Sequence, residues 1–491
     1  MKQTIYNRLC FFLLLAVCSS CYKDKGNYDY HPINEVTIQA IDTAYAVLRG
    51  DSLHIVPRKT FSLSSNPEDA YTYAWIAVND SSKTLATTPE LHEPVMLMPD
   101  NYELYYRITE KATGIKYEFK TELHVMTGIY EGWLLLNDQG NDNPRLDMLS
   151  KNVSGDFNFI SDVLSFARSP LQLSGKPRSV QVIRYRNNNP DVLIGTSTGT
   201  TRIDPETFDW NRTMNVLYDM PRNTPADFAP DRLNHQYGIT YLVDKGDLYY
   251  RNPPYSIMFA QPLNVVRMET GKFSVSPFVA VSMFSYSLLY DITNKRFLRH
   301  SVESFAPYCE LMPESPDFDY NNTGMDLVYM ERTEYNEFDV FSILKKPSGE
   351  FYLSRIYLFF DTEYETAPVR MNAPELDKAS YYAVNPDYGY VFYSVGGKLY
   401  EYDFSSNQAK LKLDISPRVI SCLQTQYMEA EKEPLKSLRK TLAVCSYDPG
   451  GPAGKSGRID FYAATAVMGD LQLRRSFSGM GKVISMDYRG R

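Results

Sequence analysis

Hydrophobic and polar residues alternate in short runs along residues 31–127. The clearest runs are VTIQAID, DSLHIVP, YTYAWIAV, NYELYYRIT and IKYEFKTELHVM, and turn residues such as Thr113-Gly114 separate them. Alternation with a period of two predicts strands that bury one face. Several short strands in one such stretch favour two packed sheets. We therefore expect residues 31–127 to form an immunoglobulin-like β-sandwich.

A second pattern repeats through residues 128–491. An apolar strand that ends in Asp, or in an equivalent residue, is followed by a polar turn and another strand, as in the outer hairpin of a propeller blade. The mean interval between the repeats is about 52 residues, close to the ~40–50 of propeller repeats. The pattern predicts a seven-bladed β-propeller, and the positions that mark its blades are Asp147, Asp204, Tyr249, Asp291, Phe341, Asp403 and Asp460.

The first and last strands of this second region complement each other. The first repeat begins directly with GWLLLND and lacks an innermost strand, whereas KVISMDYRGR follows the last repeat. Pairing between them would remove two exposed strand edges. We expect Lys482–Tyr488 to pair with Gly132–Asn137 and so to close the propeller.

The first 20 residues have the pattern of a secretion signal. Two basic residues precede the nine apolar residues Leu9–Val17, which are too few to cross a membrane as a helix. Small residues then lead into Cys21, as in a bacterial lipobox, where the cysteine becomes acylated after cleavage. Acyl chains anchor a protein stably when more than one is present. The sequence predicts a lipoprotein-type signal peptide over residues 1–20, lipidation at Cys21 and a tether over residues 21–30.

Composition and charge narrow the choice of partner. The chain has 51 Lys and Arg against 59 Asp and Glu, which gives a formal net charge of −8. Binding to nucleic acid requires basic patches, so we expect no nucleic-acid partner. The 39 Tyr agree with an all-β chain, because aromatic residues favour strands.

Catalytic and metal motifs are weak. The sequence GTSTG at 195–199 fits Gly-x-Ser-x-Gly, but the strand-like TTRID follows it in place of the helix that an esterase elbow needs. The histidines lack metal-binding spacing. A propeller hydrolase would need paired carboxylates, and no pair stands out among the acidic loop residues. Those residues are Asp231, Glu310, Asp317, Asp319, Glu375 and Asp377. The sequence predicts no catalytic residue, metal or cofactor, and leaves a glycan hydrolase or lyase as an alternative.

Two cysteines stand on neighbouring predicted strands. A hairpin around Glu433 and Pro434 would place Cys422 opposite Cys445. Such a pair forms either a disulfide bridge or two small buried thiols.

Three loop segments, 221–237, 301–322 and 362–382, are rich in aromatic residues, Pro, Asn and Asp. Loops on a rigid scaffold carry specificity, and rings flanked by polar groups suit sugars. The alternative is that these rings fill the small cores of their own loops. The candidate ligand-binding residues are Phe228, Tyr237, Tyr308, Tyr320, Tyr364, Tyr381 and Tyr382.

Three stretches carry a resemblance to a known family: CYKDKGNYDY at residues 21–30, Tyr73-Ala74-Trp75, and Tyr102–Val125. Together they resemble the PKD-like lipoproteins of Bacteroidota. The resemblance implies a PKD-like sandwich with Trp75 in its core. It also implies an outer-membrane lipoprotein at the cell surface, associated with polysaccharide uptake. Its expected role is non-catalytic glycan binding beside other uptake proteins, and the alternative is a platform for protein–protein interaction.

Overall fold

The chain divides into two compact units. The computed structural model describes residues 34–63, 68–129, 131–151, 156–185, 188–236, 238–253, 256–282, 284–302, 307–358, 362–426 and 433–490. The first unit takes in residues up to 47, 51–95 and 100–125, and the second takes in 48–50, 96–99 and 126–491. Cys21, the signal peptide and the tether lie outside the described residues. Within the described ranges, every helix is too short or too polar to cross a membrane.

The first unit contains the five expected strands and four more. Its largest sheet has the strand order β2-β9-β8-β5-β6, and β1–β4 and β3–β7 form two smaller ladders. Buried and more exposed residues alternate along β5, as the sequence pattern predicted. The strands are β1 (Val36–Gln39), β2 (Ala44–Leu48), β3 (Ser52–Ile55), β4 (Arg58–Phe61), β5 (Tyr71–Val78), β6 (Ser82–Ala86), β7 (Leu91–Pro94), β8 (Asp100–Glu110) and β9 (Lys116–Met126).

Trp75 lies at the centre of this first unit. Its side chain is fully buried, and its ring stacks on that of Tyr106, the residue opposite it on β8, with 4.3 Å between the ring centroids. Large aromatic side chains bury more surface area than the other residues of a core and so contribute strongly to its stability. The expected packing role of Trp75 is therefore confirmed.

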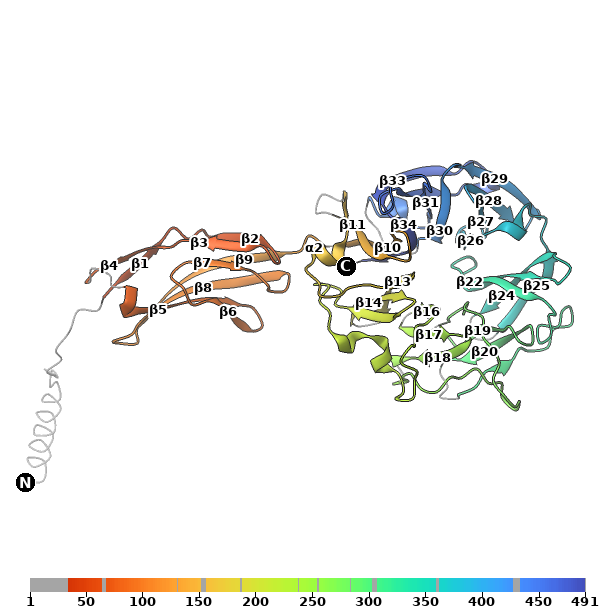
Figure 1. Cartoon of the computed structure of the whole chain (residues 1–491), viewed down its shortest axis with the longest axis horizontal. Helices are drawn as coiled ribbons and strands as arrows, with labels where there is room; N and C mark the ends of the chain where they lie inside the picture. Colours follow the sequence, from red (N-terminus) through yellow and green to blue (C-terminus); the bar gives the residue numbers. More distant parts are fainter. Residues whose placement is uncertain are drawn as a thin grey trace, which may run out of the picture. The chain divides into compact units, whose positions relative to one another are not determined.

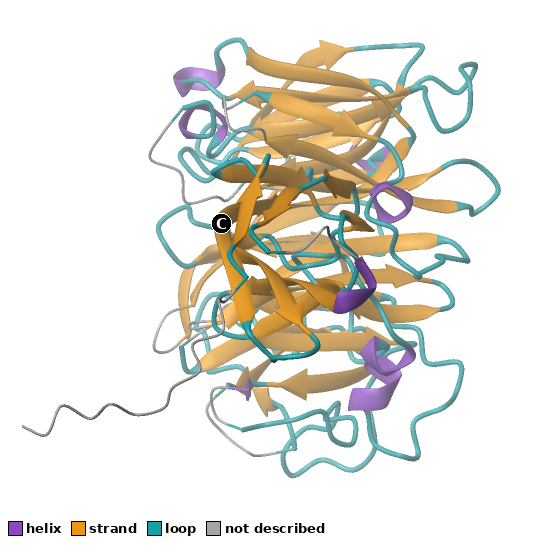
Figure 2. Ribbon diagram, turned by 90° about the vertical axis from the view of Figure 1, so that its left-hand side faces the viewer, coloured by secondary structure: helices purple, strands orange, loops and turns teal. Residues whose placement is uncertain are grey.

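The second unit consists of successive antiparallel sheets. Within its described residues there are seven, of three or four strands each, and Figure 1 shows them following one another around a common centre. The helical pieces between them are short, as Figure 2 shows. The first four sheets contain β10 (Glu131–Asp138), β11 (Pro144–Lys151), β12 (Phe157–Ile160) and β34 (Lys482–Arg489); β13 (Pro177–Tyr185), β14 (Asn188–Thr196) and β15 (Gly199–Ile203); β16 (Arg232–Gln236), β17 (Ile239–Asp244) and β18 (Asp247–Arg251); β19 (Tyr286–Asp291), β20 (Arg296–Ser301) and β21 (Glu310–Leu311).

The other three sheets have four strands each. They contain β22 (Asp326–Arg332), β23 (Asp339–Lys345), β24 (Phe351–Leu358) and β25 (Thr362–Arg370); β26 (Tyr381–Val384), β27 (Val391–Val395), β28 (Lys398–Asp403) and β29 (Gln408–Asp414); β30 (Val419–Thr425), β31 (Leu442–Tyr447), β32 (Gly457–Ala463) and β33 (Gln472–Met480). Apolar residues of neighbouring sheets pack together between them. One such cluster joins Trp133 of β10 to Phe461 of β32 and Met486 of β34.

The last strand of the chain lies in the first sheet of this unit. The order of that sheet is β12-β11-β10-β34, and β34 pairs antiparallel with β10 from Gly132↔Arg489 to Asp138↔Lys482. Because β34 takes the edge position next to β10, residues about 350 apart in the chain share one ladder. The pairing is the one that the incomplete first repeat indicated.

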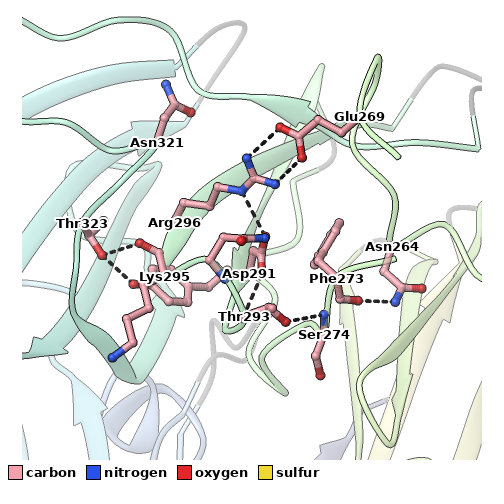
Figure 3. A network of polar contacts seen from close by, with 12 residues as sticks. Asn264, Glu269, Phe273, Ser274, Asp291, Thr293, Lys295, Arg296, Asn321 and Thr323 are labelled. Carbon is pink, nitrogen blue, oxygen red and sulfur yellow. Dashed lines mark hydrogen bonds and ion pairs between the residues drawn. The ribbon is translucent and has the colours of Figure 1, made fainter. Parts of the chain in front are cut away.

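Three of the aspartates that mark the repeats, Asp204, Asp291 and Asp403, cap turns, whereas Asp147 and Asp460 lie within β11 and β32. Asp291 is fully buried and ends β19, where one carboxylate oxygen accepts hydrogen bonds from the backbone N–H groups of Thr293 (2.9 Å) and Asn294 (3.0 Å). Its other oxygen accepts from Arg296 Nε at 3.0 Å, and Arg296 forms a two-point ion pair with Glu269 at 2.8 and 2.6 Å (Figure 3). An Asx turn of this kind reverses the chain and satisfies its orphan donors.

The predicted hairpin at the repeat marked by Asp204 is wrong in its second half. The strand β15 is followed there by the 3-10 helices η2 (Arg212–Met214) and η3 (Val216–Asp219) in place of a second strand. Asn211 and Asn215 cap these helices, accepting hydrogen bonds from the backbone N–H groups of Thr213 and Leu217. Side chains that bond to the local backbone compete with strand formation.

Cys422 and Cys445 face each other across β30 and β31, as the hairpin argument placed them. Both are free thiols and both are buried. A hydrogen bond to Cys422 together with burial raises the pKa of the Cys445 thiol well above its usual value. The pair is therefore two packed thiols in this structure.

Candidate ligand-binding channel

A cavity of about 820 Å³ lies at the centre of the second unit, where its sheets meet. Its wall is formed by edge strands of six sheets and by one further segment, namely β13, β16, β22, β26, β30, β34 and residues 277–281. Its volume lies within the roughly 300–1,000 Å³ typical of ligand sites. We call this cavity the channel.

Arg232 extends from β16 into the channel. Its guanidinium lies over the ring of Phe278, 4.6 Å from the centroid, and its Nε donates to Asn234 Oδ1 at 3.3 Å. The side chain is exposed to the channel, and among the described residues its two terminal nitrogens have no hydrogen-bond or ion-pair partner. The surrounding protein lowers its pKa, yet a guanidinium stays charged at every physiological pH.

Glu331, on β22, also lines the channel. One of its oxygens accepts hydrogen bonds from the Tyr329 hydroxyl (2.6 Å) and from the backbone N–H of Val384 (3.1 Å). Burial raises the pKa of Glu331 to about 7, against the opposing effect of these bonds and of the Arg232 charge. Glu331 therefore exchanges a proton close to neutral pH.

Some residues of the channel wall also contain buried polar atoms without partners. Burial lowers the pKa of His235 to about 4, so its imidazole is neutral at pH 7. Among the described residues, His235 Nδ1, Gln236 Oε1 and Gln181 Oε1 are buried without a hydrogen-bond partner. Buried polar atoms are costly when unsatisfied, so these three atoms lower the stability of the wall.

Three other charged residues of the wall, Arg178, Asp231 and Asp487, are already engaged. Arg178 lies 3.1 Å from Asp231, and it also donates to the backbone carbonyl of Pro230 at 2.9 Å. Asp487 accepts a hydrogen bond from the backbone N–H of Val182 at 2.8 Å. These contacts join neighbouring sheets, whereas the terminal nitrogens of Arg232 face the open space.

Two of the seven aromatic candidates line the channel. Tyr381 and Tyr382 lie on β26, and both are half-buried. The ring of Tyr382 stacks on that of Tyr329 with 5.1 Å between centroids, and burial raises the pKa of Tyr382 to about 12. The rings could thus offer a sugar their edges and hydroxyls, not two open faces.

The remaining candidates lie elsewhere. Phe228 and Tyr320 are 3% and 1% exposed and pack edge-on or tilted against Tyr249 and Phe297, so they belong to the core. The prediction that these two residues bind a ligand is wrong, because a buried ring cannot stack on a ligand. Tyr308 is half-buried beside Arg267, away from the channel wall. Tyr237 lies outside the described residues, as does the side chain of Tyr364, a residue of β25.

The acidic loop candidates are not gathered into a catalytic pair. Glu375 accepts hydrogen bonds from the Tyr400 hydroxyl and Lys398 Nζ, which lower its pKa to about 2. Glu310 lies 3.6 Å from Arg299. Of the six acidic loop candidates, Asp231 lines the channel, and it is paired there with Arg178.

Sequence reasoning missed Arg232, His235 and Glu331. Their signal was present in the runs RLNHQ and YMERT, which are short strands with polar residues on both faces. Polar residues on both faces are unfavourable in a strand that is buried between two apolar layers. They are favourable in an edge strand beside an open space. The interpretation of residues 221–237 as a loop hid the signal of the first run.

The fold now defines a class of protein: an all-β chain whose second unit is propeller-like. A quinonprotein alcohol dehydrogenase-like protein from Bacteroides thetaiotaomicron is 15% identical, with 93% of this chain and 99% of that chain covered and a TM-score of 0.50. A DUF4784 family protein from Bacteroides caccae (7% identity, 93% and 98% covered, TM-score 0.29) and a protein from Lactobacillus plantarum (8%, 73% and 100%, 0.43) also match. At 15% identity the likeness to the first of these concerns the fold alone.

Residues 21–177 match the PKD-like family. The match begins at Cys21, takes in the whole sandwich and ends at the start of β13. No curated protein matches the chain. The expected resemblance of the N-terminal part is therefore confirmed.

Proposed function

We propose that this protein is a non-catalytic surface lipoprotein whose second unit, a seven-bladed propeller, binds a saccharide in its channel. The observation that carries the proposal is the exposed guanidinium of Arg232 on the channel wall, whose terminal nitrogens no described residue binds, together with the half-buried rings of Tyr381 and Tyr382. Sugar hydroxyls both donate and accept hydrogen bonds, so one saccharide could bind both a guanidinium and tyrosine hydroxyls.

The shape of the site favours a saccharide over a protein partner. Protein partners bind broad surfaces of about 800 Å² a side, whereas the channel is concave and narrow. The half-buried rings of Tyr381 and Tyr382 add apolar surface beside the polar groups. A chain end or a short oligosaccharide fits such a space.

The lipid anchor belongs to the same proposal. Acylation of Cys21 would hold the protein at the outer membrane, and the tether and sandwich would present the propeller at the cell surface beside other polysaccharide-uptake proteins. The support is the lipobox-like sequence before Cys21 and the match of residues 21–177 to the PKD-like family.

The test is affinity electrophoresis of the full chain in detergent through gels that contain plant, host or microbial polysaccharides. Retardation by one glycan without release of sugar is the expected result. Tyr382→Ala should weaken the retardation, and Tyr218→Ala, an exposed tyrosine outside the channel, should leave it unchanged. Release of sugar would instead assign an acid role to Glu331 and favour a hydrolase. Absence of retardation across the panel would contradict saccharide binding.

A further inference from the structure

We propose that the saccharide bound in the channel carries a carboxylate, and that Arg232 binds this group. The inference rests on the proposed function and adds the chemical class of the ligand: an acidic saccharide built from uronic acids. It assigns to one residue the choice between acidic and neutral sugars.

Arg232 is held in a position ready to bind an anion. The ring of Phe278 packs against one face of its guanidinium, and its Nε donates a hydrogen bond to Asn234. These two contacts fix the orientation of the guanidinium. The terminal nitrogens remain free of protein partners within the described residues. A planar guanidinium matches the two oxygens of a carboxylate through parallel hydrogen bonds, and the fixed orientation reduces the entropy lost on binding.

The charges nearby leave this position open. One oxygen of the Glu331 carboxyl is engaged by Tyr329 and Val384, and burial favours the neutral form of the group. Asp231 is paired with Arg178. An external carboxylate would therefore meet a cation that no described acidic side chain contacts as an ion pair.

The neighbours of Arg232 suit the rest of an acidic sugar. Gln236 follows Arg232 on the same strand, and Gln181 lies on β13 next to β16, with its Nε2 bonded to the carbonyl of Leu233. Their Oε1 atoms have no partner among the described residues but are buried, so the groups open to a sugar in the same channel are the half-buried rings of Tyr381 and Tyr382. A uronic acid offers a carboxylate for Arg232 and ring carbons and hydroxyls for these tyrosines.

The experiment compares acidic oligosaccharides with their carboxyl-reduced counterparts. Isothermal titration of the full chain in detergent would use oligomers of galacturonate, of mannuronate and of hyaluronan, each beside the same oligomer after reduction of its carboxyl groups. We expect at least one acidic oligomer to bind at least 10-fold more tightly than its reduced form. Charge-assisted hydrogen bonds contribute about 1.5–3 kcal/mol, which corresponds to roughly 10- to 100-fold.

Variants assign the effect to Arg232. R232Q should lower the affinity for the acidic oligomer at least 10-fold and leave that for the reduced oligomer unchanged, and R232K should fall between the two. The matched control is K245Q, which removes an exposed cation that pairs with Asp227 outside the channel. It should bind like the unmodified protein. Thermal melting reports whether each variant folds, and the comparison of acidic with reduced oligomers needs no variant.

The outcomes separate the two proposals. Equal affinity for acidic and reduced oligomers, or full binding by a folded R232Q, would overturn the carboxylate inference and leave saccharide binding intact. A sulfated neutral oligomer that outcompetes every uronate would also overturn it, in favour of a sulfate ligand. Failure of every saccharide to bind would overturn both proposals.

Discussion

Trp133 lies directly opposite Tyr488, although the two residues belong to the first and last strands of the second unit. Their rings meet edge to face with 5.0 Å between centroids, and the Tyr488 hydroxyl donates to the buried carboxylate of Glu131. Trp133 also donates from its indole nitrogen to Gln426 of the neighbouring sheet at 2.7 Å. The end of the chain is thus built into the core of its beginning.

Met486→Ala should destabilise the second unit strongly. Met486 is 1% exposed and packs in the cluster that joins β34 to β10 and β31. Truncation of a buried Met costs about 2–5 kcal/mol. Leu473→Ala on β33 is the control, because Leu473 is half exposed, and it should change the midpoint of thermal unfolding little. Removal of residues 482–491 should lower the midpoint further than M486A, and an unchanged midpoint would contradict the structural role of β34.

Asp291→Ala should lower the free energy of unfolding by more than the loss of a surface ion pair would. Its carboxylate is fully buried and accepts hydrogen bonds from two backbone N–H groups, from Asn294 and from Arg296 (Figure 3). Its removal leaves these donors unpaired, and breaking a buried pair costs about 3–5 kcal/mol. Asp326→Ala removes a mostly exposed carboxylate that pairs with Lys295, and such pairs contribute about 0–1 kcal/mol. Chemical denaturation of the two variants should show this difference, and equal losses would sink the argument.

Glu401 should make stability depend on pH. Its carboxyl is fully buried, 3.6 Å from Lys412, and burial raises its pKa to about 7 from a usual value of 4.5. The folded state therefore holds the proton more tightly than the unfolded state. Its contribution to stability is complete below pH 4.5 and is lost as pH rises through 7, on the order of 3 kcal/mol.

Substitution of Glu401 tests the direction of this pH dependence. The fall in the unfolding free energy between pH 5 and pH 8 should be smaller for Glu401→Gln than for the unmodified protein. Glu314→Gln, at an exposed position, should retain the full fall. A fall that E401Q leaves undiminished would assign the pH dependence to other groups, such as Glu331.

Cys21→Ala should release the protein from the membrane. The lipobox-like sequence places acylation on the Cys21 side chain and on the amine that cleavage exposes. More than one acyl chain gives stable anchoring, and none is left after substitution. Fractionation and mass spectrometry of the N-terminal peptide check this, with Cys18→Ala as the control that should stay acylated and membrane-bound. An unmodified Cys21 in the membrane fraction would contradict it.

Much of the fold could be predicted from local pattern. Alternation located the strand that carries Trp75, and the spacing of the repeats located turn residues such as Asp291 and Asp403, which do cap turns. The incomplete first repeat indicated the pairing of Trp133 with Tyr488. These features succeed because a strand buried on one face and an Asx turn each leave a mark within a few residues.

The candidate site was harder to predict because it is assembled from many sheets. Aromatic loops drew attention to Phe228 and Tyr320, yet apolar rings beside polar residues are as suited to a loop core as to a sugar. The channel depends instead on which strands face the centre, and no local pattern distinguishes an edge strand from a central one. Polar residues on both faces of RLNHQ are the closest signal, and their meaning follows only from the ring of sheets.

The most direct test of saccharide binding in the channel is a crystal structure of the protein with the glycan that retards it in affinity electrophoresis. The account predicts density for sugar rings inside the channel, within hydrogen-bonding distance of Arg232 and beside Tyr382. Density that lies on the outer loops, with the channel free of sugar, would contradict it.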